Sequence, residues 1–131
     1  MCEQSISDDE VLFRRIPPGS DWFEPPDHIK SFNFKLRPGE EGISVYRASI
    51  VSKEDVLNKP GEVIAGSFLA EAKVGEIRRL TDTAEASLHL DVIAIGDEKD
   101  PGHAEIRGEA LLTRKKPAAK ALKKLFTRVA E

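Results

Sequence analysis

Two short segments of the chain carry side chains that could do acid–base or anion-binding chemistry. His103 follows the loop 96–102, and Glu105 comes two residues later. In a strand these two would share a face, where a His/Glu pair could exchange protons. Arg14 and Arg15 are adjacent, so only one of them could point into a cleft and bind a phosphate or carboxylate bidentately. The structural alternative is an edge-strand arginine and a histidine on a sheet surface.

Few other residues indicate chemistry. His28 and His89 are not spaced as metal ligands with each other or with His103, and Cys2 is the only cysteine. The chain lacks the G-x-S-x-G motif of a nucleophilic serine and the glycine-rich loops that hold phosphates. We therefore expect no metal site, no cofactor and no internal disulfide. His89 lies in an apolar stretch and is expected in the core or on a sheet face.

Basic residues are concentrated at the C-terminal end. Residues 113–131 hold seven basic residues and one acidic residue, a net charge of +6, whereas residues 1–112 hold 13 basic and 22 acidic residues, a net charge of −9. The candidate partner-binding residues are Lys115, Lys116, Lys120, Lys123, Lys124 and Arg128. Such a segment favours contact with an acidic protein or with nucleic acid. Docking of the segment on its own acidic body would explain the asymmetry equally well.

The basic segment has the pattern of an amphipathic helix. Pro117 suits a first helical turn, and apolar residues follow at helical spacing. These apolar residues are Ala118, Ala121, Leu122, Leu125 and Val129. We expect this side to pack on the domain while the lysines face solvent. The single aromatic residue, Phe126, is too little for base stacking, and the apolar side lacks the Trp typical of membrane-surface helices.

Alternation and turn residues predict a mixed, mainly antiparallel sheet with a few short helices. The expected strands are 11–16, 31–37, 43–49, 63–68, 76–80, 87–95 and 103–107, and the expected helices are 53–58, 69–74 and the segment from Pro117 onward. The clearest alternation is S-F-N-F-K-L-R at 31–37. The glycine-containing connection 38–42 would join it to 43–49 as a hairpin.

Length and composition fit one α+β domain. The chain has 131 residues, of which 40% are apolar and 33% charged, enough for a single core. We expect a disordered N-terminus at 1–10, the α+β domain at 11–112 and the basic helix at 113–131. No apolar run approaches the roughly 20 residues of a membrane span, and the acidic N-terminus is unlike a signal peptide. The sequence therefore predicts a cytoplasmic protein without membrane binding.

Four segments together resemble an uncharacterised family of short bacterial proteins. They are F-R-R-I-P-P (13–18), S-F-N-F (31–34), G-I-S-V-Y-R-A-S (42–49) and P-G-H-A-E-I-R-G (101–108). That family pairs an R-R-I-P-P strand with a Ser-Phe strand, an L-S-V strand and a late His-Ala strand. The resemblance spans roughly residues 11 to 108 and implies a bacterial, cytosolic protein, but no activity. The stretch 87–95 departs from the family's pattern as an insertion would.

A second resemblance is to RES-type toxins, which use an ADP-ribosyltransferase-like fold to attack NAD. Arg15 (or Arg14), Tyr46 and then Ser49 or Ser52 before the helix 53–58 have the order of that family's arginine strand, tyrosine strand and serine-rich turn. The family's glutamate has no clear match, with Glu54 and Glu62 both open.

Three classes of function follow from these observations. The first is a small interaction or accessory protein that binds a partner protein through its sheet surface and basic tail. The second is a small enzyme of the ADP-ribosyltransferase-like type acting on NAD or another nucleotide, with Arg15, Tyr46 and His103 as catalytic residues. The third is nucleic-acid binding through 114–128. The interaction class needs nothing that the sequence lacks, whereas the enzyme requires Arg15, Ser31 and His103 to converge on one pocket.

Overall fold

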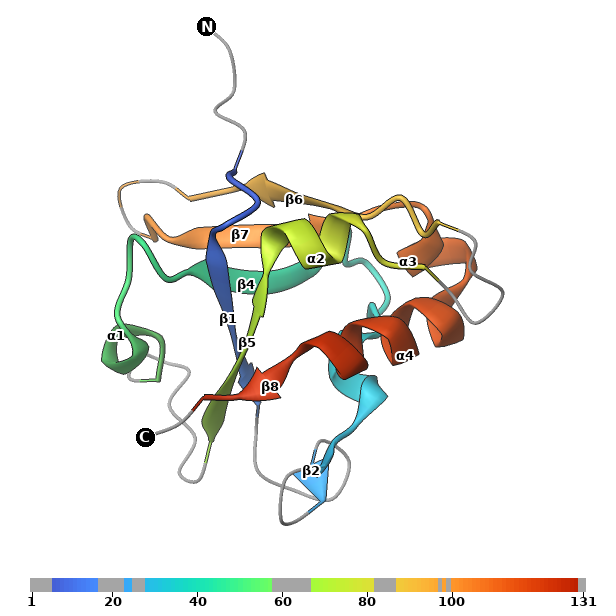
Figure 1. Cartoon of the computed structure of the whole chain (residues 1–131), viewed down its shortest axis with the longest axis horizontal. Coiled ribbons are helices and arrows are strands. Elements are labelled where there is room, and N and C mark those ends of the chain that lie inside the picture. Colours follow the sequence, from blue (N-terminus) through green and yellow to red (C-terminus); the bar gives the residue numbers. More distant parts are fainter. Residues whose placement is uncertain are drawn as a thin grey trace, which may run out of the picture.

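Six strands form one antiparallel sheet in the order β6-β7-β4-β1-β5-β8 (Figure 1). The computed structural model describes residues 6–16, 23–24, 28–57, 67–81, 87–96, 98 and 100–129. The sheet comprises β1 (Val11–Ile16), β4 (Ile43–Arg47), β5 (Phe68–Lys73), β6 (Asp91–Ala94), β7 (His103–Arg107) and β8 (Thr127–Arg128). Two further strands, β2 (Phe23–Glu24) and β3 (His28–Ile29), pair with each other. The helices are η1 (Ser31–Phe34), α1 (Lys53–Leu57), α2 (Val74–Arg78), α3 (Ala110–Thr113) and α4 (Lys115–Leu125). The α+β single domain expected from the sequence is confirmed.

The main core lies between one face of the sheet and the helical layer. Leu12 of β1 and Val45 of β4 are fully buried there, together with Phe34 of η1, Ile77 of α2 and Leu122 of α4. The alternation of β4 and β7 places Ile43, Val45, Ala104 and Ile106 on this face.

A smaller core lies on the opposite face. Phe13, Tyr46 and Leu69 project from β1, β4 and β5 and pack against Val56 of α1. Leu12 and Phe13 are neighbours and therefore point to opposite faces. The centre of the sheet is thus covered on both sides, by α1 on one and by α2, α4 and η1 on the other.

The sheet bends sharply between β4 and β1. These strands pair only at Leu12↔Arg47 and Phe13↔Tyr46, whereas β1 pairs with β5 along its whole length. Figure 1 shows β1 and β5 running steeply across the direction of β4 and β7. Beyond Phe13 the guanidinium of Arg14 donates to the backbone oxygens of Ser44 and Asn33, both at 2.8 Å. Arg14 therefore joins β4 and η1 where β1 no longer pairs with β4.

Several elements lie where the sequence predicts them. The strands at 11–16, 43–49 and 103–107 correspond to β1, β4 and β7, and the helix at 53–58 corresponds to α1. The basic segment is helical as expected, with Ala118, Ala119, Ala121 and Leu122 buried.

The predicted strand at 31–37 is wrong, and with it the hairpin to 43–49. Residues 31–34 form the 3₁₀ helix η1, and β4 pairs instead with β1 and β7. The backbone N–H and the side-chain amide of Asn33 both donate to the carbonyl of Lys30, at 3.2 and 2.8 Å, which closes a local turn. The ring of Phe34 packs on Phe126 with 4.9 Å between centroids. These contacts favour the turn over an extended strand.

The expected helix at 69–74 and strand at 76–80 are interchanged. Residues 68–73 form β5 and residues 74–78 form α2. Strand β5 lies between β1 and β8, so Leu69 and Ala70 are buried on opposite faces and the alternation of a half-exposed strand is missing. Residues 63–66 of the expected strand 63–68 lie outside the described residues.

The stretch 87–95 is a strand only in β6, residues 91–94. His89 has a left-handed backbone conformation (φ 50°) and is exposed, so it lies in neither the core nor a sheet face. A positive φ interrupts an extended strand. Thr81 and Ser87 form an isolated bridge outside the named strands.

Both ends of the described chain pack on the domain. Ile6 is 2% exposed in the main core, whereas the sequence predicts disorder throughout 1–10; residues 1–5 lie outside the described residues. At the other end α4 stops at Leu125 because Phe126 is extended (φ −78°, ψ 122°). The chain then forms β8 on the edge of β5, where Arg128 pairs with Ala70.

Candidate functional site

A group of polar side chains lies on the sheet face that carries the smaller core. Ser44 and Tyr46 on β4 are opposite Glu105 and His103 on β7. The Ser44 hydroxyl and His103 Nε2 are 3.0 Å apart, and the rings of Tyr46 and His103 are 5.7 Å apart at 37°. The His103 side chain is 20% exposed. The fold thus holds the imidazole between a serine hydroxyl and an aromatic ring.

The predicted His103/Glu105 pair shares one face, but each side chain has its own partner. The Glu105 carboxylate accepts hydrogen bonds from Arg107 Nε and Nη2, at 2.9 and 2.8 Å. On the other side of the imidazole, Asp100 lies 3.9 Å from His103 Nδ1. The acid nearest to His103 in the sequence is therefore held by a cation, and the Asp100 contact is too long for a hydrogen bond.

The order Ser44–His103–Asp100 has the residue types of a nucleophile, a base and an orienting acid. Ser44 nevertheless lies within β4, between β1 and β7, and not on an exposed turn. A serine nucleophile also needs backbone donors aimed at the developing oxyanion. The arrangement can orient the imidazole, but β4 gives Ser44 no exposed turn from which to attack a substrate.

The two arginines point to opposite faces, as their adjacency predicts. Burial lowers the pKa of the Arg14 guanidinium to about 10, and the nearby charge of Glu40 offsets part of this effect. Arg14 serves the fold by holding the oxygens of Ser44 and Asn33. Arg15 donates to the carbonyl of Val56 at 3.1 Å and so connects β1 to α1.

The residues expected to converge under the enzyme hypothesis are divided between two layers. Arg15 shares the face of Phe13, which lies opposite Tyr46, and Tyr46 lies opposite His103. Arg15, Tyr46 and His103 are therefore on one face. Ser31 belongs to η1, which packs on α4 at the other face.

The outer face of α4 carries exposed basic side chains. Lys115, Lys116, Lys120 and Lys124 are exposed, and none of the four has an ion-pair partner within the residues that the structure describes. Lys123 is partly buried, and Arg128 lies beyond the helix with its guanidinium 4.4 Å from the centre of the Phe68 ring. All six candidate partner-binding residues thus lie on the α4–β8 segment, and all of them except Lys123 are exposed.

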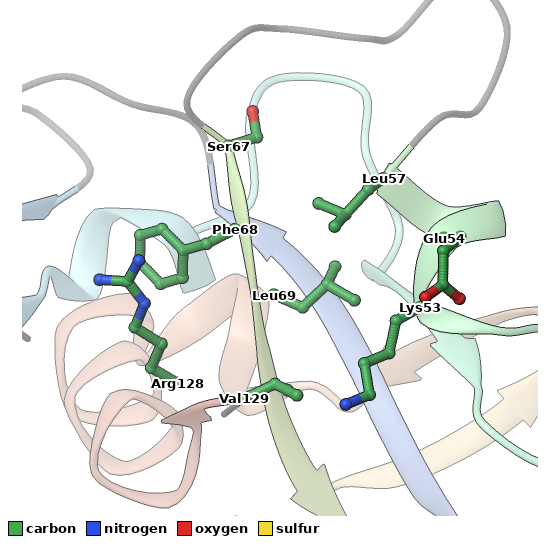
Figure 2. A pocket seen from close by; sticks show the side chains of 8 residues that line it. All are labelled: Lys53, Glu54, Leu57, Ser67, Phe68, Leu69, Arg128 and Val129. Carbon is green, nitrogen blue, oxygen red and sulfur yellow. The ribbon is translucent and has the colours of Figure 1, made fainter. Parts of the chain in front are cut away.

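A cavity that the sequence did not indicate lies between α1 and the β5–β8 edge (Figure 2). Its volume is about 280 Å³. It is lined by Lys53, Glu54, Leu57, Ser67, Phe68, Leu69, Arg128 and Val129. Of the residues singled out from the sequence, Arg128 and Glu54 contribute, whereas Arg15, Tyr46 and His103 do not line it. The cavity arises from the pairing of β8 with β5, which no local pattern reveals.

The comparisons with known proteins give no further assignment. No protein-family model, no curated protein and no solved structure matches the chain. The resemblances to a bacterial family and to RES-type toxins therefore stay predictions. In the described part of the chain, no helix is long and apolar enough to cross a membrane, and no group of three His, Cys, Asp or Glu side chains is placed to hold a metal ion.

Proposed function

We propose that the protein is a binding module that recognises an acidic partner protein through the exposed lysines of α4. The supporting observation is the contrast between these lysines and the arginines of the body. Arg47 pairs with Glu10, Arg78 with Asp8 and Asp91. Arg107 likewise pairs with Glu105 and Glu41, at 2.8 and 3.5 Å. The four exposed lysines of α4 have no such intramolecular partner among the described residues.

The geometry of α4 presents these charges together. Lys116, Lys120 and Lys124 are spaced by four residues, so they form a stripe along one side of the helix. At about 1.5 Å rise per residue the stripe is about 12 Å long. The opposite side of α4 is buried through Ala118 and Leu122, which fixes the rotation of the helix. The lysines are therefore held outward by the packing of the fold.

A protein partner fits this stripe better than a nucleic acid does. A duplex carries one charge about every 1.7 Å along its axis, so it would extend past a 12 Å stripe and face the acidic remainder of the chain. The only aromatic residue of the tail, Phe126, is 3% exposed and packs on Phe34, so it offers no surface for base stacking. A local acidic patch on a protein would meet the stripe alone.

The test uses fluorescence anisotropy with two labelled probes, a short oligoglutamate peptide and a DNA duplex of the same net charge. The triple variant K116Q/K120Q/K124Q removes the stripe, and the control K30Q/K35Q/K73Q removes three lysines outside the tail. Exposed ion pairs contribute roughly 0.2–1 kcal/mol each, so we expect the first variant to weaken peptide binding about tenfold and the control to leave it within about twofold.

Three outcomes would contradict the proposal. Equal losses in both variants would mean that binding depends only on net charge. Tighter binding of the duplex than of the peptide at the same ionic strength would favour the nucleic-acid alternative. Absence of peptide binding even at low ionic strength, where exposed charges are least screened, would remove the stripe as a binding surface.

A further inference from the structure

We infer that the cavity between α1 and the β5–β8 edge binds a small amphipathic carboxylate, a molecule with an apolar body and one anionic group. Its apolar walls come from three separate elements. Leu57 projects from the end of α1, Leu69 from β5, and Val129 follows β8. Figure 2 shows the three side chains facing the same space between α1 and β5. These walls suit an aliphatic chain or an aromatic ring.

The charge at the cavity selects an anion. The chain of Lys53 runs from α1 towards Val129 and brings its ammonium group to that end of the cavity (Figure 2). Among the described residues, the lining contains two cations, Lys53 and Arg128, and one carboxylate, Glu54. An apolar molecule that enters between Leu57 and Leu69 can therefore place a carboxylate beside the exposed ammonium group of Lys53.

Arg128 adds a preformed wall on the far side of β5. Its guanidinium stacks on the ring of Phe68, 4.4 Å from the ring centre. Stacking restricts a flexible arginine and keeps its charge close to the edge of β5. The Ser67 side chain lines the end of the cavity away from Lys53 and points away from Leu69 in Figure 2. Ser67 Oγ is buried and has no hydrogen-bond partner among the described residues, so polar groups lie at both ends of the cavity.

The volume limits the size of the ligand. At the packing density of protein interiors, about 0.74, a cavity of 280 Å³ holds on the order of ten non-hydrogen atoms. Octanoate has this size and chemistry and is the probe that we choose. Ligands this small bind with a Kd on the order of 0.1–1 mM. A long-chain fatty acid would not fit within the cavity.

The experiment is a titration of the ¹⁵N-labelled protein with octanoate, followed through its amide NMR signals. We expect saturable shifts at residues 53–57, 67–69 and 127–129. The neutral analogue 1-octanol should bind at least about fivefold more weakly, because an ion pair adds to the apolar contact. K53Q should weaken the binding of octanoate to a similar extent. The control K73Q, at an exposed lysine outside the cavity, should leave the binding unchanged.

A second variant tests the apolar part of the site. V129F fills the space beside Leu69 and should abolish octanoate binding while its amide spectrum keeps the dispersion of a folded protein. The inference is overturned by the absence of saturable shifts at these residues. It is equally overturned if octanol binds as tightly as octanoate and K53Q has no effect. Shifts that vanish in K116Q/K120Q/K124Q would assign the binding to α4 instead. None of these results depends on whether α4 binds an acidic protein.

Discussion

Replacement of Glu10 by glutamine tests the connection between the N-terminal segment and the sheet. The Glu10 side chain is 6% exposed. It accepts hydrogen bonds from Arg47 Nε at 2.9 Å and from the hydroxyl and backbone N–H of Ser49 at 2.5 and 3.1 Å. Glutamine keeps the shape but removes the charge and turns an amide N–H₂ towards one of these donors.

The expected loss follows from the number and the exposure of these contacts. A hydrogen bond to a charged group contributes about 1.5–3 kcal/mol, more than one between neutral groups. The Arg47 side chain is 23% exposed, so water compensates part of the loss. We expect E10Q to lower the free energy of unfolding by about 2 kcal/mol near neutral pH. In a domain of this size the melting temperature would fall by about 8 °C.

The pH dependence of this loss has a defined sign. Burial raises the pKa of Glu10, but hydrogen bonds from Ser49 and Arg47 outweigh it and hold the pKa below its usual value of 4.5. A carboxyl group with a lowered pKa contributes stability that is present above its unfolded pKa and lost as the pH falls through the folded pKa. The difference between wild type and E10Q should therefore be complete near neutral pH and shrink progressively below pH 4.5.

Thermal melts of wild type, E10Q and the exposed control E98Q across this pH range check the reasoning. E98Q should match wild type at every pH, because Glu98 is exposed. Equal melting temperatures of wild type and E10Q near neutral pH would refute the buried contact. A difference that persisted unchanged at low pH would show that the amide group of glutamine, and not the loss of the charge, destabilises the fold.

Three further changes test the packing of the fold, and urea unfolding measures all of them. L122A should lower the free energy of unfolding by about 3 kcal/mol, because Leu122 is fully buried in the main core. The control L112A, at a side chain that is 54% exposed, should change this free energy little. Equal effects of the two variants would mean that α4 does not pack as described. G96A should destabilise by roughly 1–3 kcal/mol, because a Cβ at Gly96 would clash with the backbone oxygen of Pro101, and an unchanged midpoint would contradict that close approach. G39A should lower the free energy of unfolding by about 1 kcal/mol through the positive φ of 87° alone, since a Cβ there meets nothing within 4 Å. A stabilised variant would contradict the left-handed conformation.

Local patterns predicted part of the sheet. Strand β7 buries one face, so its alternation is visible in the sequence. The segment 31–37 alternates equally well but forms η1, because Phe34 packs on Phe126, far along the chain. Strand β5 has buried residues on both faces and therefore shows no period. The contact of Phe34 with Phe126 is long-range, which a local pattern does not contain, whereas the interruption before β6 is local, at the positive φ of His89.

The features of the candidate sites could likewise be predicted from the sequence only in part. The opposite directions of Arg14 and Arg15 and the shared face of His103 and Glu105 follow from strand geometry alone. The pairing of Glu105 with Arg107, two residues along β7, follows from it too, but the contact of Arg14 with Asn33 of η1 does not. The cavity is the extreme case, since its walls come from α1, β5 and the segment after β8.

Strand β8 adjoins both proposed sites, but the free energy of binding at one site does not depend on the other. Pairing of Arg128 with Ala70 fixes the end of the tail, and burial of Leu122 fixes the rotation of α4. The same pairing brings Val129 against Leu69, where the Val129 N–H donates to the Leu69 carbonyl at 2.9 Å. Within the described residues, Lys115, Lys116, Lys120 and Lys124 have no ion-pair partner that their neutralisation could break, so binding by α4 can be removed without unfolding. Val129, in contrast, belongs to a wall of the smaller core, so changes there must be checked for folding before binding is interpreted.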